Sequence, residues 1–274
     1  MTKKILVVAA CLLIAVGAFA QNVPETNDHT HHFPVQGWAR PGGGGSQNLS
    51  YHGGPVLHNA RVVMIFWGTF PSGYTTSMQN FRNQFGTTPE FNVITQYSDG
   101  GGSINLTNLA SGTPDYFDTS TPPTNVTDSA VQGEVLKYLS TYTFDSSTIY
   151  EVFIPSSSYS SDGTSTSCGG PSLSYCAYHG HFSNGGRDIK YSIQPWAGCS
   201  GCQSFGNTTL DQEHFVCHET REAVTDEDLN AWYDRRGNEA DDKCAWSPTP
   251  FIGTNGYAYQ YEWSNGSSGC VKTR

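Results

Sequence analysis

The sequence predicts a single α/β or α+β domain in which a mixed sheet is flanked by helices and cross-linked by disulfides. Residues 61–68 and 149–155 are continuous apolar runs rich in β-branched and aromatic side chains, a pattern typical of strands buried on both faces. Residues 127–142 place apolar side chains on one helical face, and Thr127-Asp128-Ser129 is the expected start of this helix. Strands followed by helices, with no internal repeat and no clear linker, favour one mixed domain over residues 49–274.

The other regular elements follow from turn and capping signals. The sequence predicts short helices at 73–84 and 88–97, a longer helix at 208–225, and strands at 177–182 and 189–195. Asn184-Gly185-Gly186 joins the two strands and predicts a hairpin. Thr208 or Thr209 is the expected N-cap of the longer helix.

The N-terminus has the pattern of a cleavable secretory signal peptide over residues 1–20. Lys3 and Lys4 precede an uncharged apolar run that closes with Ala18-Phe19-Ala20, a small-x-small cleavage pattern. The run is shorter than the roughly 20 residues of a membrane-spanning helix, and no later segment is apolar enough to span a bilayer. We therefore expect a secreted protein, extracellular or periplasmic, with no membrane span.

Residues 21–48 predict an unstructured leader, because this stretch has too little apolar surface to offset the entropy of ordering it. It contains His29, His31 and His32, followed by glycines at 42–45. These imidazoles could bind a metal weakly, but a solvated tail is the expected state.

The charge of the chain is acidic, with 24 Asp and Glu against 14 Lys and Arg and a net charge of −10. Such a surface argues against nucleic acids and anionic membranes as partners. An extracellular protein or a cell-wall polymer is the expected partner.

Seven cysteines follow residue 20, and in an exported protein the default expectation is disulfides. By proximity or elimination the expected pairs are Cys168–Cys176, Cys199–Cys202 and Cys244–Cys270, with Cys217 left over. A buried free thiol is the expected state of Cys217, and a thiolate ligand beside His218 is the alternative.

The longer helix carries the motif with the clearest chemistry, His-Glu-x-x-Glu over residues 218–222. His218 and Glu222 are one helical turn apart and face the same way, as two metal ligands on one helix must. Glu219 is then placed to act as general base in a metal-dependent hydrolysis. This geometry adds the expectation of a zincin-like arrangement.

Further ligands must come from elsewhere in the chain, and the sequence leaves several choices. The candidates are Asp226, Glu239, Asp242, His179 and His181. A pair formed by His214 and His218 is also metal-competent, but it offers no general base in the expected place. An acidic, solvated helix face without any metal would show the same carboxylates.

The chain also resembles a known family. Tyr51 to Leu57, Phe66 to Gly68, Cys176 to His179 and Glu222 to Asp226 are similar to motifs of the Exordium/phosphate-induced protein 1 family and its bacterial relatives, and the likeness runs from about 49 to 270. The bacterial pattern His-Glu-x-x-Glu-Ala-x-Thr-Asp-Pro resembles His218 to Asp226, with Glu227 in place of Pro.

A second pattern of these relatives, Gly-x-Glu-Ile-Gly-Asp-x-Cys, resembles Gly237 to Cys244, with Ala240-Asp241 for Ile-Gly. The resemblance implies Glu239 and Asp242 as further metal ligands. It also implies the pairs Cys199–Cys202 and Cys244–Cys270. The plant members lack the His-Glu pair and have no settled enzymatic activity.

Two functions are expected from these patterns. The first is a secreted metal-dependent hydrolase, a zincin-like peptidase in which His218, Glu222, Glu239 and Asp242 hold the metal and Glu219 is catalytic. Zinc is the first choice of ion, and calcium or manganese also suits so many carboxylates. The alternative is a non-enzymatic extracellular or cell-wall-associated binding protein with a structural ion or none. His52 and His179 are expected to be core histidines.

Overall fold

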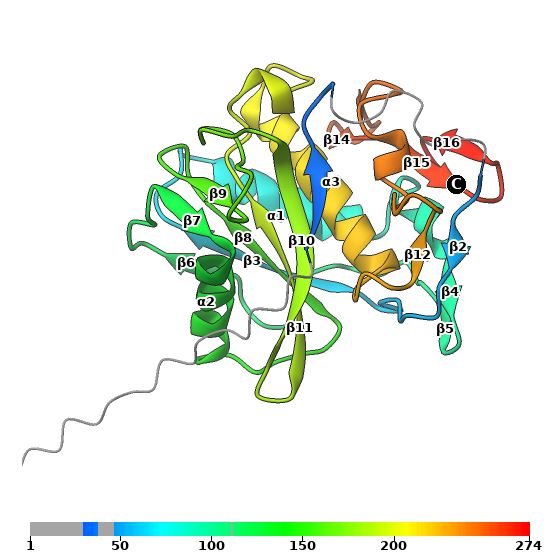
Figure 1. Ribbon diagram of the computed structural model, residues 1–274, viewed down its shortest axis with the longest axis horizontal. Helices are drawn as coiled ribbons and strands as arrows, with labels where there is room; N and C mark the ends of the chain where they lie inside the picture. Colours follow the sequence, from blue (N-terminus) through cyan, green and yellow to red (C-terminus); the bar gives the residue numbers. More distant parts are fainter. Residues whose placement is uncertain (1–29, 38–46, 111) are drawn as a thin grey trace, which may run out of the picture.

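A mixed six-stranded sheet forms the centre of the fold (Figure 1). The structure is a computed structural model of the 274-residue chain and describes residues 30–37, 47–110 and 112–274. The strand order is β1 (Thr30–Pro34), β10 (Tyr175–Asn184), β11 (Arg187–Gln194), β8 (Thr148–Phe153), β3 (Arg61–Trp67) and β6 (Tyr116–Asp118). The four strands β11, β8, β3 and β6 run parallel to one another, and β10 is antiparallel to both of its neighbours, β1 and β11. The expected mixed α/β architecture is confirmed.

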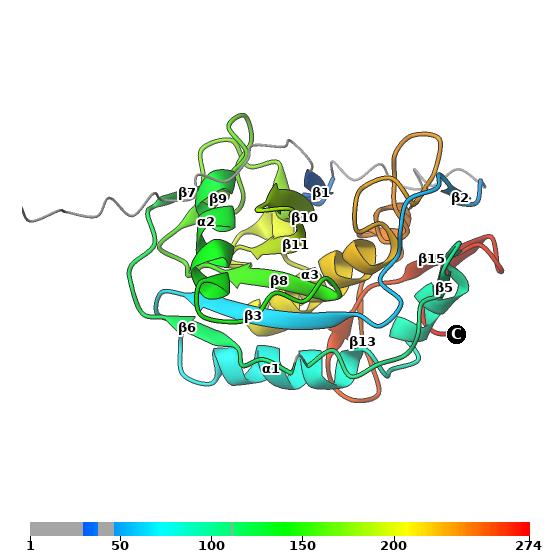
Figure 2. The same cartoon turned by 90° about the horizontal axis from the view of Figure 1, so that it is seen from below.

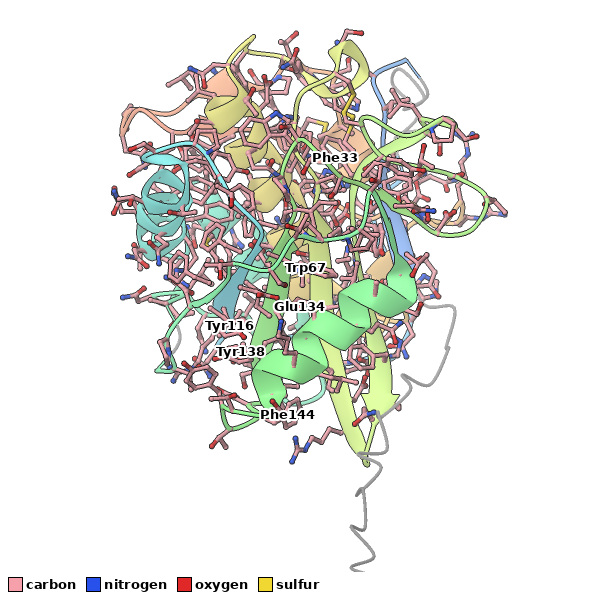
Figure 3. The ribbon with its side chains drawn as sticks, turned by 90° about the vertical axis from the view of Figure 1, so that its left-hand side faces the viewer. Phe33, Trp67, Tyr116, Glu134, Tyr138 and Phe144 are labelled. Atoms are coloured by element: carbon pink, nitrogen blue, oxygen red, sulfur yellow. A yellow bond between two sulfur atoms is a disulfide. The ribbon has the colours of Figure 1, made fainter. Side chains whose placement is uncertain are left out.

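Helices cover both faces of this sheet. Helix α2 (Asp128–Leu139) packs on one face, and α1 (Tyr74–Phe85) and α3 (Thr208–Thr225) pack together on the other. Figure 2 shows α1 and α2 on opposite sides of β3, and Figure 3 shows α2 lying across the sheet. Successive side chains of β3 alternate between the two cores, which explains its unbroken apolar sequence.

Short two-stranded pairs and 3-10 turns complete the fold. The pairs are β2 (Ser50–Tyr51) with β12 (Trp232–Tyr233), β4 (Ser98–Asp99) with β5 (Gly102–Ser103), β7 (Asn125–Thr127) with β9 (Tyr159–Ser161), β13 (Phe251–Ile252) with β14 (Ala258–Tyr259), and β15 (Glu262–Ser264) with β16 (Gly269–Val271). The 3-10 turns are η1 (Phe91–Gln96), η2 (Ser200–Cys202) and η3 (Asp242–Cys244).

The helix ends test the capping expectations. Helix α2 begins where it was expected, and Thr127 is its N-cap, since its hydroxyl accepts a hydrogen bond from the backbone N–H of Ala130 at 3.3 Å. The cap of α3 is Asn207, whose side chain accepts from the N–H of Thr209 and Leu210. The expectation of a threonine cap there was wrong, because the helix begins one residue earlier and Asn207 accepts from its first free N–H groups. Among the described residues, no helix has the length and apolar character needed to cross a membrane.

The N-terminal segment corrects the expectation of an unstructured leader over 21–48. Strand β1 pairs with β10 in antiparallel register, and Phe33 on it is fully buried. The strand exists because one apolar side chain and an open sheet edge supply the burial and hydrogen bonds that its polar composition lacks. The expected signal peptide, His29 and residues 38–46 lie outside the described residues.

The disulfides correct two of the three expected pairs. The observed bonds are Cys168–Cys199, Cys176–Cys202 and Cys244–Cys270, and Cys217 is free and buried as expected. Cys199 and Cys202 sit at the two ends of the η2 turn, where each reaches a different segment. Their short sequence spacing therefore misled the prediction of a local bond.

Candidate metal centre

Four segments meet beside the C-terminal half of α3 and bring together the five residues to which the sequence analysis assigned catalytic or metal-binding roles. Helix α3 supplies His218, Glu219 and Glu222, and the turn around η3 supplies Glu239 and Asp242. Strands β10 and β1 run alongside, as Figure 1 shows, and add His179 and His31, which pair across the two strands. Helix α3 is buried from Asp211 to Thr225, so the alternative of an acidic solvated face is wrong.

Glu222 is the centre of this cluster. Its Oε2 lies 3.1 Å from Nε2 of His218 and 3.8 Å from Nδ1 of His179. The backbone N–H of Asp242 donates to the other carboxylate oxygen, Oε1, at 3.0 Å. Glu222 belongs to each of three donor groups in this region, formed with His31 and Glu239, with His179 and Glu219, and with His218 and Asp242. One oxygen is thereby anchored, and the other faces the imidazoles.

Glu219 pairs with a histidine from the neighbouring strand. Nδ1 of His179 lies 3.1 Å from Oε2 of Glu219, and Nε2 of the same ring lies 3.7 Å from Oε1 of Glu239. His179 is buried, as expected of a core histidine, but it faces three carboxylates rather than the apolar core. The expectation for His52 was wrong, because this side chain is exposed and stacks on Tyr233 at 3.7 Å.

His31 is the site residue that sequence reasoning missed. Its Nε2 lies 2.6 Å from Oδ2 of Asp242, and its Nδ1 lies 3.6 Å from Oε1 of Glu239. It was expected in a solvated tail, since nothing near it in sequence fixes a partner. The signal present was Phe33, an aromatic residue two positions later that shares a strand face with His31.

Gln260 orients two histidines of α3. Its amide Nε2 donates to the carbonyl and to Oδ1 of Asp241, both at 2.8 Å, so Oε1 is left as the acceptor. Nε2 of His214 and Nδ1 of His218 both approach this oxygen, at 2.9 and 3.1 Å. Each ring therefore donates to Gln260 from that nitrogen, and the second ring nitrogen of His218, Nε2, is directed toward Glu222. His214 joins none of the donor groups found among the described residues.

Burial and mutual repulsion act together on the carboxylates. The pKa values of Glu219 and Glu239 lie well above the usual range, first because burial disfavours their charged forms and then because Glu222 is near. Burial also raises the pKa of Glu222, where Asp242 adds repulsion and His218 opposes it. Burial lowers the pKa of His218, but Glu222 outweighs it and brings the value to about 9. A divalent cation would relieve this accumulation of buried acids.

The donor atoms fit a small divalent cation. Two ligands about 2.1 Å from a tetrahedral zinc lie about 3.4 Å apart, and Nε2 of His218 and Nδ1 of His179 lie 3.1 and 3.8 Å from Oε2 of Glu222. Several buried atoms here have no hydrogen-bond partner: Nε2 of His179 and His218, and one oxygen each of Glu219, Glu222 and Glu239. Buried polar groups are rarely left unpaired unless an ion or water satisfies them.

The remaining candidates have other roles. Asp226 caps the end of α3 and accepts from the N–H of Ala231. His181 lies in a separate group with Asp188 and Asp228, where Lys190 pairs with both acids. Cys217 joins none of the donor groups in the described residues, and burial raises its thiol pKa to about 12.

Comparison with known proteins adds no identification. No protein-family model matches the chain, and neither a curated protein nor a solved structure gives a match. The relation to the Exordium family therefore stays a proposal based on sequence motifs.

Proposed function

We propose that this protein is an exported metal-dependent hydrolase, a zincin-like peptidase related to the bacterial Exordium-type proteins. The observation that carries the proposal is the approach of two buried imidazole nitrogens, Nε2 of His218 and Nδ1 of His179, to Oε2 of Glu222, within a cluster that holds several buried atoms without a hydrogen-bond partner. His218 and Glu222 provide the first two ligands, and His179, Glu239 and Asp242 supply the others. Three disulfides and an acidic surface suit work outside the cytoplasm.

Glu219 is the proposed general base. Its Oε2 is held by His179, and its Oε1 has no partner and lies in the same buried cluster, where it can take and return a proton. A bound divalent ion supplies Lewis acidity that polarises a carbonyl and activates water. Burial strengthens each of these electrostatic contributions, because water no longer screens them.

Zinc is the preferred ion. Each of the three donor groups that include Glu222 contains one imidazole, and zinc accepts mixed nitrogen and carboxylate ligands. Calcium takes six to eight oxygen ligands. The structure adds His179 and His31 to the one histidine of the motif, which makes calcium a poorer match than the sequence suggested. Manganese remains the competing choice, because its affinity for carboxylates and imidazole is compatible with the same residues.

Metal content tests this proposal directly. Protein covering residues 21–274, without a polyhistidine tag, is purified after growth with zinc, manganese and calcium, and its tightly bound metal is measured. We expect zinc in the wild type and in His52→Ala, an exposed histidine outside the cluster, and none in His218→Ala. Glu219→Gln should keep the metal and lose hydrolysis of a mixed peptide library. Metal-free wild-type protein would overturn the proposal.

A second candidate is a non-enzymatic extracellular protein that binds another protein or a cell-wall polymer. The observation in its favour is the complete burial of His179, His218, Glu219 and Glu222, which suits a structural ion. On this alternative, chelation lowers the melting temperature, and neither wild type nor any variant hydrolyses the library.

A further inference from the structure

The proposed catalytic site is closed to solvent. Glu219, Glu222, His179 and His218 are fully buried, and the most exposed member of the cluster is His31, whose side chain is 24% exposed. A hydrolase must admit its substrate to the general base, so part of this cover has to leave during the working cycle.

Strand β1 forms the part of the cover that lies directly on the site. The ring of Phe33 stacks on the imidazole of His218 with centroids 3.9 Å apart. His31, on the same face of the strand, reaches Glu239 and Asp242. Both side chains of β1 that face α3 therefore occupy space that a substrate would need.

The site is covered by β1 and by the turn around η3, and these two segments are attached to the rest of the protein differently. The turn that carries Glu239 and Asp242 is tied to the body by the disulfide Cys244–Cys270. Strand β1 contains no cysteine and lies at the edge of the sheet, where its strand partner within the described part of the chain is β10 alone. It can leave without breaking a covalent bond, and its departure would expose the backbone donors and acceptors of β10.

We propose that β1 holds the site shut by occupying the place of substrate, and that the substrate is an extended polypeptide which replaces β1 along β10. This inference rests on the proposed hydrolase function and specifies its substrate class and its latency. Addition of a peptide strand to an exposed sheet edge satisfies the same backbone groups that β1 satisfies now. It also carries the peptide past Glu219.

The surroundings of Phe33 define a side-chain preference. Its ring contacts His214, Phe215, His218 and Trp246, with centroid separations from 3.9 to 5.7 Å. When β1 leaves, this aromatic pocket accepts a large apolar side chain of the incoming peptide. The substrate is thus an extended segment with an aromatic residue in the position that Phe33 holds.

Hydrogen exchange of the wild-type protein gives the first test. We expect the amides of β1 to exchange about tenfold faster or more than the amides of β11, under conditions where the whole fold stays intact. The two strands should exchange in separate openings. If β1 exchanged only together with β11, in global unfolding, the proposal would be overturned.

Peptide binding gives the second test, in a Glu219→Gln background that prevents cleavage. A fluorescein-labelled peptide copying residues 28–37 is titrated against the chain carrying Phe33→Ala, with Gln36→Ala as the matched control, since Gln36 is exposed in the same segment. We expect the Phe33→Ala protein to bind about tenfold tighter or more than the control. A peptide that itself carries Phe33→Ala should bind about tenfold more weakly.

Equal affinities for the two proteins and the two peptides would overturn the proposal. Circular dichroism checks that Phe33→Ala is folded, and if it is not, the exchange result decides. Neither measurement depends on metal content or turnover. A protein that binds the peptide but holds no metal would refute the hydrolase and leave the peptide-binding edge. If the protein bound zinc but β1 opened only in global unfolding, the proposal that a substrate replaces β1 would be refuted and the hydrolase proposal would stand.

Discussion

Gln260 and His218 are joined by a hydrogen bond of 3.1 Å in which the imidazole donates from Nδ1 to the amide oxygen. The direction of this bond is fixed by the other end of the amide, which donates to Asp241. In the neutral ring the proton therefore lies on Nδ1, and Nε2, which is directed toward Glu222, is the nitrogen that would be free to bind a metal. A buried glutamine on the β14–β15 connection thus sets the tautomer of the proposed first ligand.

Replacing this glutamine should weaken the site without removing a ligand. Gln260→Leu takes away the acceptor that orients His218, and we expect zinc affinity to fall about 10- to 100-fold. Competition with a chromogenic chelator measures the change. The control is Gln212→Leu, a buried glutamine on α3 that donates to Gln194 and not to the site. Equal affinities in the two variants would show that Gln260 does not position the ligand.

Arg221 should be essential to stability. It is fully buried on α3 and pairs with Asp241 and, at 2.6 Å, with Glu262. Arg221→Met keeps most of the apolar stem and leaves two buried acids without their cation, which we expect to cost about 3–5 kcal/mol of unfolding free energy. Urea denaturation measures this loss. Arg187→Met, at an exposed position, should change stability by less than about 1 kcal/mol.

Glu151 predicts a pH dependence that is separate from the metal cluster. Burial raises its folded-state pKa to about 8, while a hydrogen bond from Thr220 opposes the shift. The folded protein then binds more protons than the unfolded chain between pH about 4.5 and 8, so stability falls as the pH rises through that window.

The variant Glu151→Gln should lose this dependence. We expect it to gain stability relative to wild type as the pH rises from 5 to 9, by a few kcal/mol in total. Urea midpoints of both proteins across this range give the difference. Asp145→Asn, at a half-exposed pair with Arg61, is the control and should run parallel to wild type. A constant difference for Glu151→Gln would mean that its carboxyl titrates normally.

The sequence predicted those features that depend on local periodicity. The apolar runs of β3 and β8 and the helical spacing of His218 and Glu222 each fix a structure within a few residues. Helix α3 was recognisable for the same reason. The burial of this helix from Asp211 to Thr225 was not recognisable, because its polar side chains are balanced by partners such as Glu262 and Gln260 that lie far along the chain.

Long-range pairing explains what the sequence could not give. Strand β1 is too polar to predict, and it forms because β10 presents an edge and α3 presents a pocket for Phe33. His31 enters the site only through that pairing. The Cys176–Cys202 bond likewise depends on how the loop before α3 folds against β10, which no local spacing reveals.

Two of the disulfides make it possible to separate an effect on stability from an effect on metal affinity. Cys168–Cys199 and Cys244–Cys270 close segments of similar length, with sequence separations of 31 and 26. Chain entropy then predicts a similar loss for removing either, about 3.5 kcal/mol. Cys244, however, ends the η3 turn that begins at Asp242 and follows Glu239.

We therefore expect the two double variants to differ at the metal centre. Cys244→Ala with Cys270→Ala should lower zinc affinity about tenfold or more, because the turn that supplies two carboxylates gains freedom. Cys168→Ala with Cys199→Ala should leave zinc affinity within about threefold of wild type while losing similar stability. Removing both partners of each bond creates no new thiol beside Cys217. Equal losses of zinc affinity would show that the effect follows global stability rather than the position of Glu239 and Asp242.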